Sequence, residues 1–139
     1  MKWYGKVMVD PTQRFWVAYE AKSGKLVGTV GLANIDLVNS RCEYGRLLVD
    51  PNFVHRGYGA ELLGLAVEVA FKDLKLNSIH GLVLERNTPG WLLASKLGFQ
   101  VEATLLEWVQ KKGKFLNVRV VQLTASHFAK TTTKEFRNG

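Results

Sequence analysis

A predicted strand, a glycine-rich loop and a long predicted helix follow one another in this 139-residue chain, and no other feature constrains its fold as much. The strand is expected at Cys42 to Val49, where Asp50-Pro51 stops it. Apolar residues then recur at helical spacing from Ala60 to about Leu76. The loop between them contains Gly57-Tyr58-Gly59, and the two glycines allow a tight turn because they have no Cβ. The helix therefore begins with free amides and a positive dipole end, which favour a phosphate group.

The other predicted elements are strands, apart from one short helix. A turn at Ser23-Gly24 joins the first two strands, and the basic turn Lys111-Lys112-Gly113-Lys114 joins the last two. The expected strands lie at 17–20, 26–32, 79–84, 99–109 and 115–124, and the short helix runs from Thr88-Pro89 to Gly98. This order predicts an α/β fold with a mixed sheet covered by helices. We expect a single domain at residues 1–130 and a flexible tail at 131–139.

Charge and cysteine content limit the classes of function. The formal net charge is +7 and the pI is near 9.7, which indicates an anionic partner, either nucleic acid or a phosphorylated small molecule. The basic residues are scattered, so a solvated turn at Lys111 to Lys114 is preferred and nucleic-acid binding is not expected. Cys42 is the only cysteine and the histidines lie at no metal-ligand spacing, so no disulfide and no metal site are expected. No signal peptide or membrane-spanning run is found, and we expect a cytoplasmic protein without membrane contact.

The glycine-rich loop fits a merely tight turn as well as a phosphate site when it is taken alone. Two common phosphate-binding motifs do not fit it. A Walker loop requires Gly-Lys followed by Ser or Thr, whereas this chain has Gly59-Ala60-Glu61. A Rossmann fingerprint needs a third glycine within an alternating strand-helix-strand unit, and the strands predicted before this loop are antiparallel.

Two blocks of the sequence resemble the Gcn5-related N-acetyltransferase (GNAT) family. Residues 47–63 are similar to its central motif, in which a strand ending in Val-x-Pro leads to R/Q-x-x-G-x-G/A and a helix that begins with paired leucines. Residues 87–99 are similar to its motif N-x-x-A-x-x-L-Y-x-K-L-G-F, and Lys96-Leu97-Gly98-Phe99 matches outright. The resemblance covers residues 42 to 124 and implies a GNAT fold with a mostly antiparallel sheet. It also implies a short amino-terminal form, because the family's usual first strand and two helices find no room before residue 17.

The resemblance implies acetyl-CoA as co-substrate and assigns its contacts. Backbone amides of the loop would hold the pyrophosphate, and main-chain groups of Leu48 and Val49 would pair with the pantetheine arm. Asn87 would bind the same arm, although an ordinary cap at a strand end explains this residue equally well. The loop residues concerned are Arg56, Gly57, Tyr58, Gly59 and Ala60.

Catalysis is expected to depend on Glu43, which lies six residues before Val49, as does the base glutamate in the histone-acetylating branch of the family. A carboxylate there would take the proton that an attacking amine must lose. The alternative is a solvated or lysine-paired carboxylate. The chain departs from the family at Val54, where Arg or Gln is usual, and at Ala94, where many members have the tyrosine that protonates the departing thiolate.

The predicted activity is therefore acetyl transfer from acetyl-CoA to a primary amine of a small molecule or a peptide amino terminus. Two explanations of the short amino terminus stay open: a natural short form, or a homodimer in which a second subunit completes the acceptor site. The alternative is an acyl-CoA-binding sensor or interaction module with the same fold and no catalysis, which Ala94 and the short amino terminus favour.

Overall fold

One seven-stranded sheet organises the protein in the computed structural model, which describes residues 2–6 and 10–138. The strand order is β1-β2-β3-β4-β5-β7-β6, and every neighbouring pair is antiparallel except β4 and β5. The strands are β1 (Lys2–Lys6), β2 (Arg14–Tyr19), β3 (Leu26–Asp36), β4 (Arg41–Val49), β5 (Ser78–Leu84), β6 (Gln100–Lys111) and β7 (Lys114–Thr124). The β2–β3, β3–β4 and β6–β7 pairs are hairpins of consecutive strands, whereas α2 and β6 lie between the antiparallel partners β5 and β7. The parallel pair β4–β5 requires a crossover through a helix.

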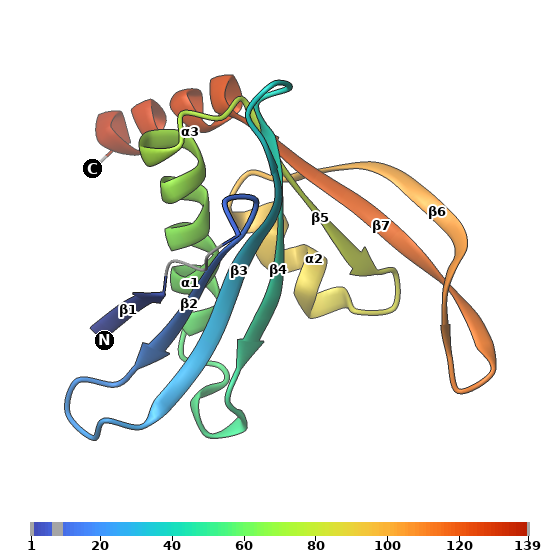
Figure 1. Ribbon diagram of the computed structural model, residues 1–139, viewed down its shortest axis with the longest axis horizontal. Coiled ribbons are helices and arrows are strands. Elements are labelled where there is room, and N and C mark those ends of the chain that lie inside the picture. Colours follow the sequence, from blue (N-terminus) through green and yellow to red (C-terminus); the bar gives the residue numbers. More distant parts are fainter. Residues whose placement is uncertain (1, 7–9, 139) are drawn as a thin grey trace.

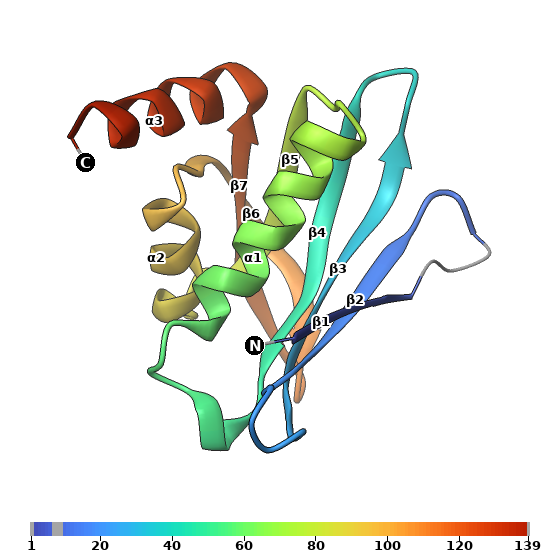
Figure 2. The same cartoon turned by 90° about the vertical axis from the view of Figure 1, so that its left-hand side faces the viewer.

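The helices lie on one side of this sheet, as Figure 2 shows. They are α1 (Tyr58–Glu68), α2 (Thr88–Lys96) and α3 (Ala125–Asn138), and a π-helical turn at Val69–Asp73 extends α1. The apolar face of α1 packs on β3 and β4 and buries Leu62, Leu63, Ala66 and Val67. We call this covered side of the sheet the inner face and the opposite side the outer face. No helix in the described part of the chain is both long and apolar enough to span a membrane.

Strands β4 and β5 are paired over only three residues. Arg41 to Glu43 lie opposite Ser78 to His80, and the next residues, Tyr44 and Gly81, begin a separation that continues to the ends of both strands. Figure 1 shows β4 and β5 diverging from this point. The edge of β4 that faces β5 therefore has no strand partner after Glu43 among the described residues. Unpaired strand edges offer amide and carbonyl groups to another molecule.

The fold class predicted from the sequence is confirmed, and most element positions agree within a few residues. The strand β1 was not predicted; it pairs with β2, so the expected short form lacks the two helices in the described residues but does have a first strand. The helix α3 was not predicted either. This helix runs from Ala125 to Asn138. The flexibility of residues 131–139 and the domain limits stay predictions.

Candidate functional site

The loop between β4 and α1 is fixed by local contacts. The Asp50 carboxylate accepts a hydrogen bond from the Asn52 amide at 2.9 Å and begins a single 3-10 turn at Pro51–Phe53. Phe53 is buried, and the guanidinium of Arg56 lies 5.3 Å from the centre of its ring. Such a stack holds the arginine in place and leaves its N–H groups free for an anion.

Gly57 turns the chain into α1 with φ at +81°, in the left-handed region that favours glycine. No side chain caps this helix, and its first internal bond runs from the amide of Glu61 to the carbonyl of Gly57. A Cβ on Gly59 would lie 3.2 Å from the side chain of Leu93, so α2 approaches the first turn of α1 closely. The amides of Tyr58, Gly59 and Ala60 thus stand at the positive end of the helix dipole, as predicted for an anion site.

The end of β4 lies tightly against β3. A Cβ on Gly28 would overlap the carbonyl oxygen of Leu48, so only glycine fits at this crossing. Leu48 and Val49 pair with Thr29 and Gly28 on the β3 side. Their other backbone edge faces the gap left by β5, which is where the sequence predicts contacts to the pantetheine arm.

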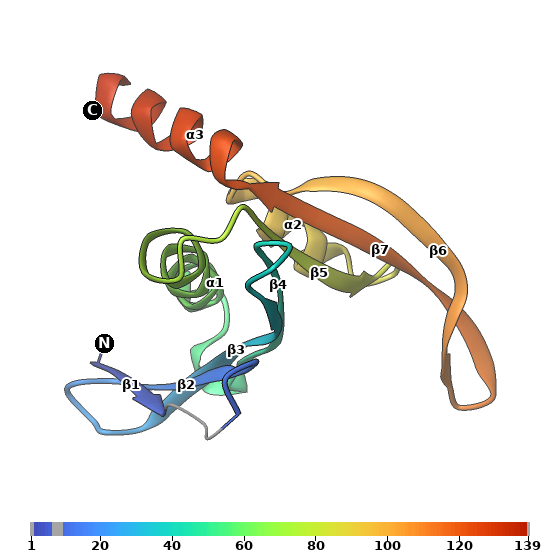
Figure 3. The ribbon, with the colours of Figure 1, turned by 45° about the horizontal axis from the view of Figure 1, so that its top comes forward.

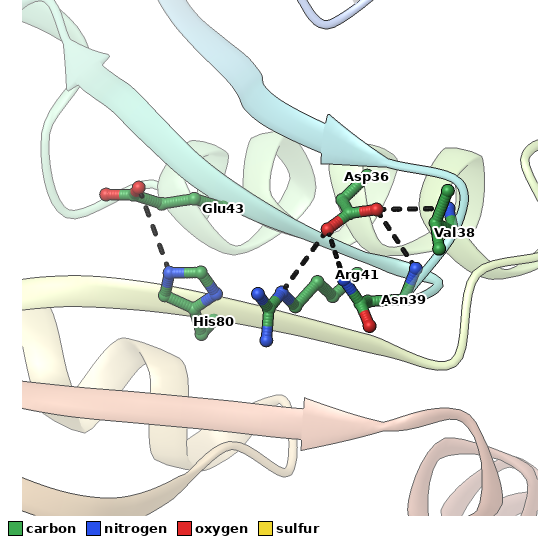
Figure 4. A network of polar contacts seen from close by, with 6 residues as sticks. All are labelled: Asp36, Val38, Asn39, Arg41, Glu43 and His80. Atoms are coloured by element: carbon green, nitrogen blue, oxygen red, sulfur yellow. Dashed lines mark hydrogen bonds and ion pairs between the residues drawn. The ribbon is translucent and has the colours of Figure 1, made fainter.

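Glu43 lies on the outer face, at the last position of β4 that pairs with β5. Its carboxylate accepts a hydrogen bond from the Asn34 side chain at 3.0 Å, and Nε2 of His80 lies 3.8 Å from the same oxygen. Figure 4 shows His80 reaching toward Glu43 from the neighbouring strand. The Glu43 side chain is 25% exposed, so it is supported by neighbours yet accessible to a substrate. Glu43 was predicted from the sequence, whereas Asn34 and His80 were not, because only the strand register brings them to it.

The turn before Glu43 is held by the Asp36 carboxylate, which is also drawn in Figure 4. Its oxygens accept hydrogen bonds from the Asn39 side chain at 2.8 Å and from the amides of Val38 and Asn39 at 3.0 Å. The Asn39 side-chain bond is the main cause of a pKa below the usual range for Asp36. Arg41 adds an ion pair with Asp36 at 3.8 Å, so the β3–β4 hairpin is fixed two residues along each strand from the Asn34–Glu43 contact.

Comparisons with known proteins agree on one family. A profile of the Acetyltransferase (GNAT) family matches residues 1–99. The chain belongs to the GNAT family. The N-acetyltransferase p20 of Bacillus licheniformis is 31% identical over 108 residues, which are 78% of this chain and 60% of p20. The spermidine N(1)-acetyltransferase of Vibrio cholerae is 25% identical over 125 residues, 90% of this chain and 71% of that protein.

Solved structures show the same fold. The spermidine N-acetyltransferase from Vibrio cholerae in complex with CoA and spermine superposes with a TM-score of 0.81 at 24% identity, over 87% of this chain and 70% of that one. A spermidine/spermine N-acetyltransferase structure from the same organism gives a TM-score of 0.82 over 88% of this chain and 73% of that one. The present chain thus spans roughly two thirds of the relatives and structures it matches.

The structure shows the surroundings of Asn87 and Ala94, the two residues of this GNAT chain whose roles the sequence left open. Asn87 caps α2, because its side-chain oxygen accepts a hydrogen bond from the Gly90 amide at 3.1 Å. The capping alternative is therefore what the structure contains, and a cofactor contact by the Asn87 amide group stays a prediction. Ala94 is fully buried on α2, so the usual tyrosine hydroxyl of the GNAT motif has no counterpart at that position.

Tyr44 lies on the inner face, opposite to Glu43, as a regular strand requires. Its ring covers Gly81 on β5, where a Cβ would overlap it, and its centre lies 5.3 Å from that of Phe99 in an edge-to-face contact. Burial raises the pKa of the Tyr44 hydroxyl to about 12. A hydroxyl group therefore stands, still protonated at neutral pH, where β4 and β5 begin to separate.

Metal ligands are not gathered in the structure. Among the described residues, no three His, Cys, Asp or Glu side chains lie close enough together to hold an ion. Cys42 is fully buried on the inner face, and burial raises the pKa of its thiol to about 12. Such a thiol is neutral and shielded, so it behaves as a small apolar core residue.

Proposed function

We propose that this GNAT chain transfers the acetyl group of acetyl-CoA directly to a primary amine, on a small molecule or a peptide amino terminus. The observation that carries the proposal is the position of Glu43. A partly exposed carboxylate, held by Asn34 and flanked by His80, stands on the outer face where β4 loses its partner β5. The relatives support the reaction class, since those from Vibrio cholerae are spermidine N-acetyltransferases.

Each group of the chain has a separate task in this reaction. The backbone amides of Arg56, Gly57, Tyr58, Gly59 and Ala60 would hold the pyrophosphate, and the free edge of Leu48 and Val49 would bind the pantetheine arm. Glu43 would accept a proton from the amine, directly or through water. The neutral nitrogen then forms the C–N bond to the acetyl carbon as the C–S bond breaks. CoA leaves as a thiolate, and the second proton that the nitrogen loses passes through water to this sulfur. Acetyl-CoA, when bound, supplies the thioester.

Tyr44 is our candidate for the partner of the departing thiolate, in place of the hydroxyl missing at Ala94. Its hydroxyl would donate a hydrogen bond to the sulfur without giving up its proton, because its pKa is raised to about 12. Hydrogen bonds to charged groups contribute about 1.5–3 kcal/mol, so Tyr44→Phe should lower kcat by about 10- to 100-fold. Steady-state rates measure this, with the affinity for acetyl-CoA as the control. An unchanged kcat in a folded Tyr44→Phe variant would remove the hydroxyl from the mechanism.

The proposed activity is tested by thiol release from acetyl-CoA in the presence of simple primary amines. Glu43→Gln keeps the shape of the side chain and its bond to Asn34 but cannot take a proton, and general bases contribute about 100-fold or more, so kcat should fall by at least that factor. Thermal stabilisation by acetyl-CoA should be unchanged in the variant, because Glu43 lies away from the α1 loop. Equal rates for Glu43→Gln and the wild type would reject Glu43 as the base.

The alternative is a non-catalytic acyl-CoA sensor. The buried Ala94 favours it, and so does the outer face, which no helix of the described residues covers. The same experiment separates the two functions. A sensor would be stabilised by acetyl-CoA and would release no thiol with any amine. Failure of acetyl-CoA to stabilise the protein would reject both.

We also propose a cytoplasmic homodimer in which a second copy covers part of the outer face. Figure 3 shows β6 and β7 as a long twisted hairpin that extends beyond the rest of the sheet. This hairpin exposes Leu106, Trp108 and Phe115, an apolar set suited to a protein contact. Sedimentation velocity is the test, and a monomer at every concentration would reject the second copy.

A further inference from the structure

We infer that the acceptor amine carries a carboxylate group, which Arg46 binds on the outer face beside Glu43. The inference rests on the proposed acetyl transfer, because it names the class of amine that the same site receives. A small pocket of about 60 Å³ lies near the middle of β4. The pocket is lined by Gln13, Arg14, Phe15, Gly31, Leu32, Ala33, Gly45 and Arg46.

Strand register places this pocket next to Glu43. Ala33, which lines the pocket, is the direct partner of Glu43 across β3 and β4. Gly45, which also lines it, follows Glu43 by two residues on the same strand face, a separation of roughly 7 Å along a strand. An amine at the Glu43 carboxylate would therefore have its own substituent, a few bonds away, over the pocket.

A bulge in β4 directs Arg46 to this place. The register between β3 and β4 shifts between Thr29 and Gly31, and Arg46 has φ at +49°. The Thr29 hydroxyl donates a hydrogen bond to the Arg46 carbonyl at 2.7 Å, which holds the bulge. The Arg46 guanidinium then lies 5.6 Å from the centre of the Phe15 ring, on the outer face. Stacking of this kind orients the planar guanidinium and leaves its N–H fork available to a carboxylate.

The charges around the pocket select against a polyamine. Both charged residues of its lining are arginines, and arginine stays protonated at every relevant pH. No acidic residue in the described part of the chain lines the pocket. Glu43, two residues before Gly45, is the one carboxylate on β4. A second ammonium group would meet Arg46 and be repelled, whereas a carboxylate would form a charge-assisted bidentate pair. The pocket volume suits a group as small as a carboxylate.

Three amines of matched length test the inference: 4-aminobutyrate, butylamine and 1,4-diaminobutane. We expect kcat/KM to fall in that order, with at least about a tenfold preference for 4-aminobutyrate over butylamine, because only the carboxylate can form a charge-assisted bidentate pair with Arg46. In Arg46→Met the preference for 4-aminobutyrate should largely vanish, because the KM for 4-aminobutyrate increases. Arg41→Met is the matched control: Arg41 belongs to the same strand but pairs with Asp36, and its removal should leave the preference intact.

The outcomes separate this inference from the proposed function. Equal or better acetylation of 1,4-diaminobutane, or a preference that survives Arg46→Met, would overturn the carboxylate assignment while acetyl transfer stands. Absence of thiol release with all three amines would reject the proposed function instead. Calorimetric titration with 4-aminobutyrate in the presence of CoA then decides the carboxylate site alone: binding that Arg46→Met abolishes supports it, and no binding to the wild type overturns it.

Discussion

The two faces of β4 differ in almost every physical respect, although their residues alternate along one strand. The inner face of β4 packs against α1 and places Cys42 and Tyr44 in the core, where Tyr44 contacts Phe99 and both side chains are buried. The outer face presents Glu43 and, through a bulge, Arg46, and both are accessible. Packing therefore fixes the side chains of the inner face, whereas the outer face is free to carry charged groups that bind an acceptor.

The largest effect on stability is expected when high pH ionises Cys42 and Tyr44 on the inner face. The pKa values of Cys42 and Tyr44 are raised to about 12, so both groups stabilise the fold below their ordinary pKa values. That contribution is lost as the pH rises from about 9 toward 12, at up to about 1.4 kcal/mol per pH unit for each group. Urea unfolding between pH 8 and 11 should show the loss. Cys42→Ala should weaken the dependence of the unfolding free energy on pH, even though it lowers that free energy at pH 8. An unchanged pH dependence would mean that solvent reaches Cys42.

A somewhat smaller effect is expected from Gly81→Ala, again on the inner face. The new Cβ would overlap the ring of Tyr44, which is held between β5 and Phe99. Overpacking of this kind costs about 1–3 kcal/mol of unfolding free energy. Gly64→Ala is the control, because a Cβ there meets nothing within 4 Å and alanine favours a helix. Chemical denaturation measures both, and equal stabilities for the two variants would contradict the tight packing of Tyr44 on Gly81.

The smallest effect on stability is expected on the outer face, from Asn34→Gly. Asn34 has φ at +50°, which glycine adopts without strain, and the change removes only the exposed hydrogen bond to Glu43. The unfolding free energy should change by less than about 0.5 kcal/mol, as for most exposed contacts. The rate of acetyl transfer should fall several-fold, because Glu43 loses the donor that orients it. A large loss of stability would show that the outer face is also a packing surface.

Much of the inner face could be predicted from the sequence, since strand and helix periodicity locate α1, and the glycine pattern with Lys96-Leu97-Gly98-Phe99 identifies the fold. Of the outer face, the sequence indicated Glu43 but not its neighbours. The Asn34 and His80 contacts to Glu43 depend on register and a parallel pairing. Arg46 reaches Phe15 only because of a bulge, which leaves no signal in the local composition.

The remaining misses have similar causes. The strand β1 is short and contains Gly5, so its pairing with β2 is set by the sheet edge and not by a strong local pattern. The polar sequence of α3 favours neither helix nor strand strongly, and its preceding strand β7 determines where it starts. Val54, which replaces the family's Arg or Gln, is exposed in the loop.

Hydrogen exchange with and without acetyl-CoA tests most directly whether the unpaired side of β4 and the start of α1 form one binding surface. We expect acetyl-CoA to slow exchange at the amides of 48–49 and 56–60, and to leave those of β2 and the β6–β7 turn unchanged. Protection confined to Lys111 to Lys114, or none in the α1 loop at saturating acetyl-CoA, would contradict this account.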